Sequence, residues 1–304
     1  MKQMKNFNQL KKFIQNNPLI VTEPSLAAIK RESLNDKNGG LFFGVGIVSK
    51  DKISTGVPFD ILAMFFACEQ LRRILNFKKV IVLIADTHAI SNEKFSDKTV
   101  KQVTTQTLQT LRNVISNFHL ASFELFLASD ICGRPDFQLI LSKIPPMDNQ
   151  YLRLEVADCL WLQRNENLKI KVGWTMRKDN NEIGHDERFF DQQIKVFCPF
   201  LSFIHLKPGH TFNKERPRVS PYLATTGEDR IIIKKDENAA RKIAAAKLTW
   251  QDNQLGGGTN HLAAVVRAFE NLFGRLPSST LEAKIQFILN KAIGTQAANK
   301  VVKR

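Results

Sequence analysis

The sequence predicts an α/β fold, a doubly wound Rossmann-like parallel sheet of about five strands followed by a C-terminal helical domain. One observation is a series of short, continuously apolar runs, which indicate buried strands. These runs are residues 41–48, 80–85, 123–128, 168–173 and 201–206. The second observation is that helical patterns separate them. Apolar strands that alternate with helices are typical of a parallel sheet covered on both faces and wound by right-handed crossovers.

The helices are predicted from apolar residues at helical spacing. Pro58 precedes such a stripe that runs from Phe59 to Leu75, and proline is tolerated near a helix start because the first turn needs no N–H partner. Further helical patterns cover 97–117, 150–162 and 186–197. Ligands of doubly wound sheets bind beyond the carboxyl ends of the strands, so we expect the chemistry in the loops there.

The character of the chain changes after Pro221. Three helical patterns follow at 236–248, 260–273 and 279–293. We therefore expect three regions, which are an N-terminal extension over 1–40, a nucleotide-binding domain over 41–225 and a basic helical domain over 226–304.

Composition and charge exclude several classes of protein. With 304 residues, 43% hydrophobic residues and 22 Phe, the chain is neither disordered, fibrous nor a disulfide-stapled miniprotein. No apolar run is long enough for a transmembrane helix or a signal peptide, which predicts a cytoplasmic protein. The four cysteines have no metal-site or redox spacing, so we expect buried free thiols. They are Cys68, Cys132, Cys159 and Cys198.

The chain is strongly basic, with 44 Lys and Arg against 29 Asp and Glu and a net charge of +15. Residues 201–304 carry 17 of these basic residues and 8 of the acidic ones. A positive field of this size attracts polyanions and favours nucleic acid as a partner. The alternative is that the excess charge only keeps the protein in solution.

Common nucleotide and hydrolase motifs are absent, since the sequence has no GxGxxG, P-loop or GxSxG. The helix over 150–162 instead places Tyr151, Glu155 and Asp158 on one face, at spacings of four and seven. A tyrosine and two carboxylates in one stripe can hold an amine and a polar group at a fixed separation. The alternative is a solvated helix face.

Two later segments also carry charged side chains at expected loop positions. Gly184 precedes Asp186 and Glu187 at a predicted strand-to-helix turn, where acidic residues favour the helix N-terminus. The long loop after residue 206 carries Arg218 and Ser220 among further basic residues, and such a loop suits a triphosphate. The alternatives are a well-capped helix and a solvated basic loop.

The order of these segments resembles the tyrosyl- and tryptophanyl-tRNA synthetase subfamily of class I synthetases, from about residue 40 to about residue 293. The segment YLRLEVADCL is similar to that family's amino-acid-binding helix, and VIVLIADTHAISN to its strand and turn IADxHAxT. GHDER resembles the family's Gly-x-Asp-Gln segment. RVSPY stands in place of the mobile Lys-Met-Ser-Lys-Ser loop, and IIIKKDENAARKIAAAK follows it as the family's strand and helix do.

The resemblance implies an amino-acid site built mainly on the 150–162 helix. Tyr151 and Glu155 would face the α-amino group of the substrate, and Asp158 the polar tip of an aromatic side chain. Asp86 and His88 would border the site. The partners implied are tRNA and an amino acid, with a homodimer as in most relatives, and no metal ligand is expected among the side chains.

The resemblance also implies ATP, accompanied by Mg²⁺, as the second substrate. Thr55, Arg218 and Ser220 would act on the phosphates as the catalytic set. The nucleotide-binding set would be Gly44, Gly56, Gly184, Asp186 and Glu187. The expected reaction is attack of the amino-acid carboxylate on the α-phosphate of ATP, followed by transfer to the terminal ribose of tRNA, through positioning and charge stabilisation.

The sequence departs from the family at the His-Ile-Gly-His signature. The corresponding stretch Phe59, Asp60, Ile61 and Leu62 has no histidine, and each such donor is typically worth about 3 kcal/mol in the transition state. Pro221 also replaces the second lysine of the mobile loop.

Three functions therefore stay open. The first is a divergent synthetase-like ligase, and the second is a pseudo-synthetase that binds tRNA or a partner without adenylation. The third is an enzyme similar to cyclodipeptide synthases, with Ser49 or Ser54 as nucleophile beside Tyr151 and Glu155.

Overall fold

The structure is a computed structural model of the 304-residue chain. It describes residues 20–21, 37–47, 56–91, 97–146, 150–174, 196–197, 201–207, 232–234, 266 and 268–293.

The central element is a six-stranded sheet with the order β1-β7-β6-β2-β4-β5. Its strands are β1 (Ile20–Val21), β2 (Gly40–Gly46), β4 (Lys79–Ala85), β5 (Phe123–Leu127), β6 (Leu168–Trp174) and β7 (Ser202–Lys207). The five longer strands are parallel, and the two-residue β1 pairs antiparallel with β7 at the edge. The predicted α/β fold with about five parallel strands is confirmed.

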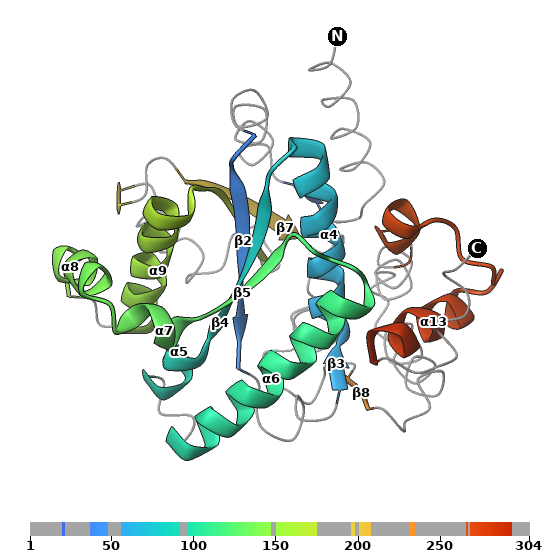
Figure 1. Ribbon diagram of the computed structural model, residues 1–304, viewed down its shortest axis with the longest axis horizontal. Coiled ribbons are helices and arrows are strands. Elements are labelled where there is room, and N and C mark those ends of the chain that lie inside the picture. The colour runs from blue at the N-terminus through green and yellow to red at the C-terminus, as the bar shows by residue number, and fades with distance from the viewer. Residues whose placement is uncertain are drawn as a thin grey trace, which may run out of the picture.

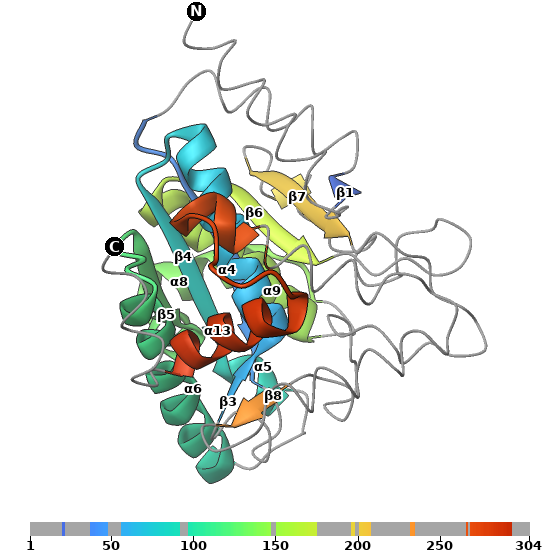
Figure 2. The ribbon, with the colours of Figure 1, turned by 90° about the vertical axis from the view of Figure 1, so that its right-hand side faces the viewer.

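Helices cover both faces of this sheet, as Figures 1 and 2 show. One face carries α4 (Phe59–Leu75), α6 (Asp97–Asn117) and α13 (Leu281–Ile293), and the other carries α7 (Ala128–Cys132), α8 (Pro135–Lys143) and α9 (Gln150–Glu166). A short helix, α5 (Asp86–Ser91), follows β4 directly. The two layers follow from the strands, whose side chains on both faces are apolar.

Aromatic side chains fill the layer between the sheet and α4. Phe65 stacks on Phe123 with ring centroids 4.9 Å apart, and Phe66 meets Phe118 edge to face at 5.1 Å. Phe269, from the C-terminal region, meets Phe66 at 5.7 Å. Such pairs stabilise a core beyond the area that they bury. The C-terminal helices thus share the apolar core between the sheet and α4.

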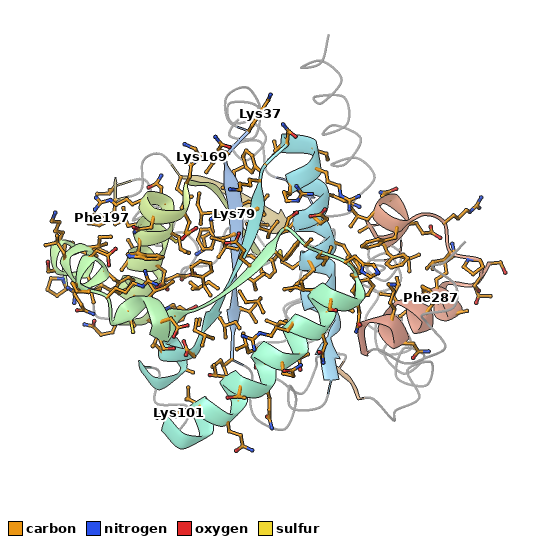
Figure 3. The ribbon with its side chains drawn as sticks, viewed as in Figure 1. Lys37, Lys79, Lys101, Lys169, Phe197 and Phe287 are labelled. Atoms are coloured by element: carbon orange, nitrogen blue, oxygen red, sulfur yellow. The ribbon has the colours of Figure 1, made fainter. Side chains whose placement is uncertain are left out.

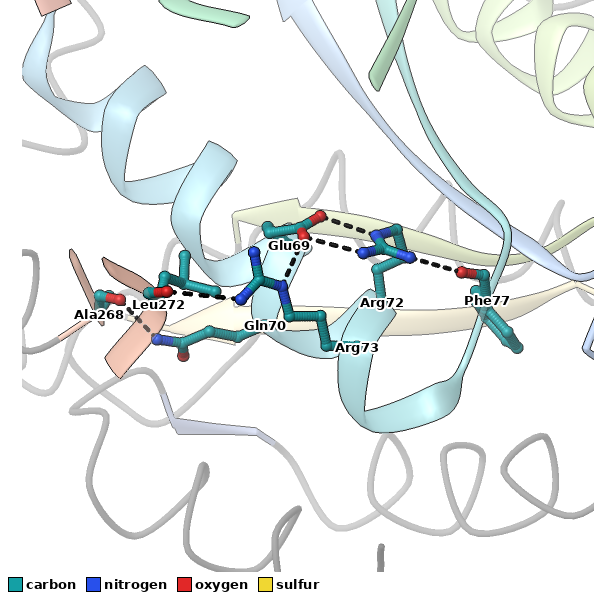
Figure 4. Close-up of polar contacts among 7 residues, drawn as sticks. All are labelled: Glu69, Gln70, Arg72, Arg73, Phe77, Ala268 and Leu272. Atoms are coloured by element: carbon teal, nitrogen blue, oxygen red, sulfur yellow. Dashed lines mark hydrogen bonds and ion pairs between the residues drawn. The ribbon is translucent and has the colours of Figure 1, made fainter. Parts of the chain in front are cut away.

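Polar contacts also join the C-terminal helices to α4 (Figure 4). The Gln70 side chain donates to the backbone carbonyl of Ala268 at 2.7 Å, and Arg73 donates to that of Leu272 at 3.4 Å. Glu69 accepts from both Arg72 and Arg73 at 2.7 Å and holds these side chains in place. The domain boundaries that we predicted stay predictions, although the described helices of 226–304 pack on α4 and α6 and share their apolar core.

The predicted elements and the structure agree best where the periodicity is longest. The helix over 97–117 is confirmed at both ends, and α9 continues four residues beyond 162. Sequence reasoning missed the short helices α5, α7 and α8, because one or two turns are too short to show a periodic stripe. It also missed strand β3 (Gly56–Pro58), whereas its antiparallel partner β8 (Ile232–Lys234) falls in the segment that the family resemblance implies to be a strand. Most of the predicted helices 186–197 and 236–248 lie outside the described residues.

The three cysteines in the described part of the chain are free thiols, as expected, but only two of them are buried. Cys68 and Cys159 are buried, Cys132 is half-buried, and Cys198 lies outside the described residues. Burial, with a smaller contribution from the neighbouring Glu69, raises the pKa of the Cys68 thiol well above its ordinary value.

Candidate functional site

Three helices meet beyond the carboxyl end of the sheet. Helix α5 begins directly after β4, helix α7 begins directly after β5, and both contact α9. The C-terminal end of α9 leads into the start of β6, so its first turns lie toward the carboxyl ends of the parallel strands (Figure 1). This is the edge where a doubly wound sheet places its ligands.

Asp86, the first residue of α5, connects α5 to α7 at this edge. Its Oδ1 accepts from the backbone N–H groups of Thr87 and Ser129, both at 3.0 Å, and its Oδ2 accepts from the Ser129 hydroxyl at 2.6 Å. The carboxylate is buried, and all three donors come from the chain itself. Asp86 therefore fixes α5 against α7 and orders the ends of two neighbouring strands.

His88 links α5 to the predicted amino-acid helix. Its Nε2 lies 3.0 Å from Oδ2 of Asp158, and its ring meets the Tyr151 ring edge to face at a centroid distance of 5.0 Å. His88 and Asp158 are buried, and Tyr151 is half-buried. Burial raises the pKa of the Asp158 carboxyl, and the contact with His88 opposes this shift.

Glu155 lies on the same helix but pairs with a lysine of the sheet. The Lys171 ammonium donates to Glu155 Oε1 at 2.6 Å and lies 5.7 Å from the centroid of the Phe42 ring. Phe42 and Lys171 are direct register partners on β2 and β6, so their side chains share one face of the sheet.

The Lys171 side chain is only 6% exposed, whereas that of Glu155 is 25% exposed. Desolvation lowers the pKa of Lys171, but the electrostatic influence of Cys159, Glu155 and Asp158 outweighs it and leaves the pKa raised. The ammonium therefore keeps its charge in a buried position.

Gly44 and Gly46 follow Phe42 on the same face of β2, since side chains alternate along a strand. Both glycines are exposed although β2 is a central strand, and a Cβ at either position would meet no described atom within 4 Å. The backbone of β2 thus reaches the surface beside Lys171 and its partners. A flat group can approach the strand there.

The structure brings together one subset of the predicted site residues. Gathered at the carboxyl edge are Asp86, His88, Tyr151, Glu155 and Asp158, and the exposed Gly44 lies on the central strand. Gly56 is part of β3, where it pairs with Lys234 of β8. The others lie outside the described residues, namely Thr55, Gly184, Asp186, Glu187, Arg218 and Ser220. The solvated-face alternative for α9 is wrong, because Asp158 is 1% exposed.

Sequence reasoning missed two residues of this site. Lys171 lies in the segment LKIKVG, where lysines alternate with apolar residues in a strand that has covered faces on both sides. A lysine in the middle of such a strand is expected to be buried, and this signal was available; Lys169, near the start of the strand, is half-buried. Ser129 follows the strand 123–127 by two residues, but nothing in its sequence position links it to Asp86.

The described residues contain neither a candidate metal site nor a candidate membrane span. No group of three or more His, Cys, Asp and Glu side chains there could hold a metal ion. None of the helices described is long and apolar enough to cross a membrane.

Comparison with known proteins gives a likeness of fold. No protein-family model matches the chain, and no curated protein matches it. Among solved structures, tyrosyl-tRNA synthetase from Archaeoglobus fulgidus in complex with L-tyrosine aligns with a TM-score of 0.57 and 15% identity, over 99% of this chain and 100% of that one.

Two further structures agree with this result. Tyrosyl-tRNA synthetase from Aeropyrum pernix gives a TM-score of 0.55 at 13% identity over 100% of this chain and 98% of that one. Tryptophanyl-tRNA synthetase from Plasmodium falciparum gives 0.53 at 12% identity over 96% of this chain and 88% of that one. The chain thus has a Rossmann-like fold similar to that of tyrosyl- and tryptophanyl-tRNA synthetases.

Proposed function

We propose that the chain is a divergent aminoacyl-tRNA synthetase-like protein of the tyrosyl/tryptophanyl type, which binds ATP and an aromatic or related amino acid and transfers that amino acid to tRNA. The observation that carries this proposal is the contact of Tyr151, His88 and Asp158 at the carboxyl edge of the sheet, beside the exposed backbone of Gly44.

The amino-acid side of the proposal rests on the chemistry of these side chains. Tyr151 and His88 present two aromatic rings, and the Asp158 carboxyl is an acceptor in a buried environment. A phenol O–H or indole N–H that reaches Asp158 would donate a hydrogen bond to a charged acceptor, the stronger class of such bonds. An aromatic amino acid with a polar tip suits this arrangement.

The nucleotide would lie against the central strand. Gly44 and Gly46 carry no side chain, so an adenosine could approach the backbone of β2 without displacing any described residue. Mg²⁺ would arrive on the phosphates of ATP and help to neutralise their charge. Thr55, Gly56, Gly184, Asp186, Glu187, Arg218 and Ser220 remain proposed ATP and phosphate residues.

The reaction needs no nucleophile from the protein. A carboxylate oxygen of the amino acid would form a bond to the α-phosphorus of ATP, the bond to pyrophosphate would break, and the ribose hydroxyl of tRNA would later displace AMP. The chain would contribute positioning and neutralisation of charge. Its basic C-terminal part would contact tRNA, and a homodimer and a cytoplasmic location belong to the same proposal.

A pseudo-synthetase is the second candidate, and one observation favours it. Helix α4 begins at Phe59, where the related signature has its histidines, and Leu62 in that stretch is fully buried in the core. Position 62 therefore supplies a buried apolar side chain to the core instead of an imidazole donor to the site. In this second function tRNA or a partner protein would bind while adenylation is lost.

Calorimetric titration with ATP, L-tyrosine and L-tryptophan in turn tests the proposal, together with amino-acid-dependent exchange of pyrophosphate into ATP. We expect binding of ATP and of one aromatic amino acid, and measurable exchange. Asp158→Asn should weaken the amino acid about tenfold or more, since bonds to charged acceptors are worth about 1.5–3 kcal/mol. Asp130→Asn, an exposed acid on α7, is the matched control.

The outcomes separate the two candidates. Binding of tRNA that weakens steeply with salt, without any binding of ATP or amino acid, would establish the pseudo-synthetase. Absence of binding to ATP, amino acid and tRNA would reject the synthetase-like function and the tRNA-binding form of the pseudo-synthetase. Release of diketopiperazines by cells that express the protein would instead favour the cyclodipeptide-synthase-like alternative, whose serines 49 and 54 lie outside the described residues.

A further inference from the structure

Lys171 has an unusual position for a lysine. It is 5% exposed, it lies on a central strand, and its ammonium is held between the Glu155 carboxylate at 2.6 Å and the Phe42 ring at 5.7 Å. A carboxylate and an aromatic face are two of the groups with which proteins hold an ammonium ion. The chain therefore contains an ammonium-binding pair, Glu155 and Phe42, and its own lysine occupies it.

The neighbouring acids have partners as well. Asp86 accepts from Thr87 and Ser129, and Asp158 lies against His88. A ligand with a free amino group that enters this edge must therefore share a carboxylate with one of the chain's own groups. Of the two α9 acids at this edge, Glu155 has the more exposed side chain, at 25% against 2% for Asp158. It is thus the one that an incoming ammonium can reach.

We propose that Lys171 is a specificity-determining residue, which competes with the amino group of the ligand for Glu155. This inference rests on the proposed function, in which Glu155 faces the α-amino group of the amino acid. Because Lys171 occupies Glu155, a ligand gains less affinity from its own ammonium group at this site. The site then discriminates poorly between an amino acid and the same molecule without its amino group.

Paired ligands test the competition. The protein is titrated with L-tyrosine and with 3-(4-hydroxyphenyl)propanoic acid, which lacks only the amino group, and likewise with L-tryptophan and 3-indolepropanoic acid. In the wild-type chain we expect similar dissociation constants within a pair. Lys171→Met removes the competing charge, so it should tighten the amino acid roughly tenfold relative to its deaminated partner, the value of one charged hydrogen bond.

A double-mutant cycle distinguishes competition from a structural role. In a Glu155→Gln background the disputed carboxylate is gone, so Lys171→Met should leave the ratio of the two dissociation constants nearly unchanged. A structural effect of the lysine would instead alter both ligands alike in both backgrounds. Lys169→Met is the control on the same strand, toward the amino ends of the strands, where Figure 3 labels Lys169 near Lys37 and Lys79.

Three results would overturn the inference. One is a wild-type protein that prefers the amino acid over its deaminated partner by tenfold or more, which leaves the proposed function intact. Another is an unchanged ratio in Lys171→Met when the amino acid still binds, which also leaves that function intact. If neither member of either pair binds to the wild type or to Lys171→Met, the inference and the proposed amino-acid site both fail.

Discussion

The two faces of the sheet are built differently. The face under α4, α6 and α13 is packed with apolar side chains from β2, β4, β5 and β6, and its aromatic rings contact one another. The opposite face is packed in the same way under α8 and α9, but its buried charges Asp158 and Lys171 accompany an exposed Gly44 at the carboxyl edge. The α4 face also holds two buried charges, Glu69 and Lys291, and these lie on its helices.

This difference separates stability from function within one sheet. Apolar burial stabilises a fold, whereas buried charges cost free energy unless they are paired. On the α9 face, these buried charges lie near the region where the first turns of α9 meet the ends of the strands. We therefore expect substitutions on the α4 face to alter stability alone, and substitutions on the α9 face to alter binding, with mixed or opposite effects on stability.

The largest effect is expected from Phe66→Ala on the α4 face. Phe66 is fully buried against Phe118 and Phe269, so its truncation leaves a cavity and should lower the free energy of unfolding by about 3–5 kcal/mol. Urea denaturation measures this loss. Leu139→Ala, at an exposed position of α8, should change stability by less than about 0.5 kcal/mol. Equal losses in the two variants would break the comparison.

Glu69→Gln should come next. Although desolvation raises the pKa of Glu69, hydrogen bonds from Arg72 and Arg73 outweigh it and lower the pKa below the ordinary value. A lowered pKa in the folded state means stability that is present above pH 4.5 and lost as the pH falls. We expect Glu69→Gln to cost about 2 kcal/mol at pH 7, because it removes the charge that accepts hydrogen bonds from Arg72 and Arg73.

The pH profile provides the check for Glu69. Urea denaturation of wild type and Glu69→Gln from pH 7 down to pH 3 should show the difference shrinking as the carboxyl becomes protonated. A difference that stays constant with pH would mean that the loss is due to packing rather than charge.

Asp158→Asn tests the opposite face. Burial raises the pKa of Asp158, so in the wild type its ionised form opposes folding and stability increases as the pH falls through the raised pKa. The amide variant should therefore be more stable than the wild type at pH 7, while it binds the amino acid about tenfold more weakly. Thermal unfolding at pH 7 and at pH 3.5 measures the first effect, and calorimetry measures the second.

The sign of the stability change decides this prediction. The advantage of Asp158→Asn should disappear below pH 3.8, the ordinary pKa of the group, because both forms are then neutral. A variant that is less stable than the wild type at pH 7 would mean that the contact with His88 outweighs the cost of burial.

The smallest effect is expected from Lys284→Met. Its ammonium donates to Glu270 at 2.7 Å on the outside of the C-terminal helices, and both side chains are partly exposed. Ion pairs near the surface contribute about 0–1 kcal/mol, so urea denaturation should detect little change at moderate salt. A loss above 2 kcal/mol would show that this pair, rather than the aromatic core, holds the C-terminal helices in place.

Much of the fold was predictable because long periodic segments carry their own signal. The continuous apolar run 80–85 and the 21-residue stripe of α6 fixed a strand and a helix that the structure reproduces almost to the residue. Short elements such as α7 were not predictable, since five residues contain barely more than one helical turn.

The sequence indicated which residues form the candidate site, but not which of them pair with one another. The spacing of Tyr151, Glu155 and Asp158 placed them on one face of α9, and the resemblance to the synthetase subfamily implied that Asp86 and His88 border the site. Which acid meets which base depends on the register between β2 and β6 and on the packing of α5 against α9. No local pattern in the sequence contains that information.

The sequence by itself thus determined the layered α/β fold, the helix that carries the candidate site and the residue types available to it, because hydrophobic periodicity and chain order are local properties. Only the tertiary structure decided that His88 contacts Asp158 and that Lys171 pairs with Glu155. These pairs join residues 70 and 16 positions apart in the chain, and buried charges choose their partners by distance in space, where the low dielectric makes each unpaired charge costly.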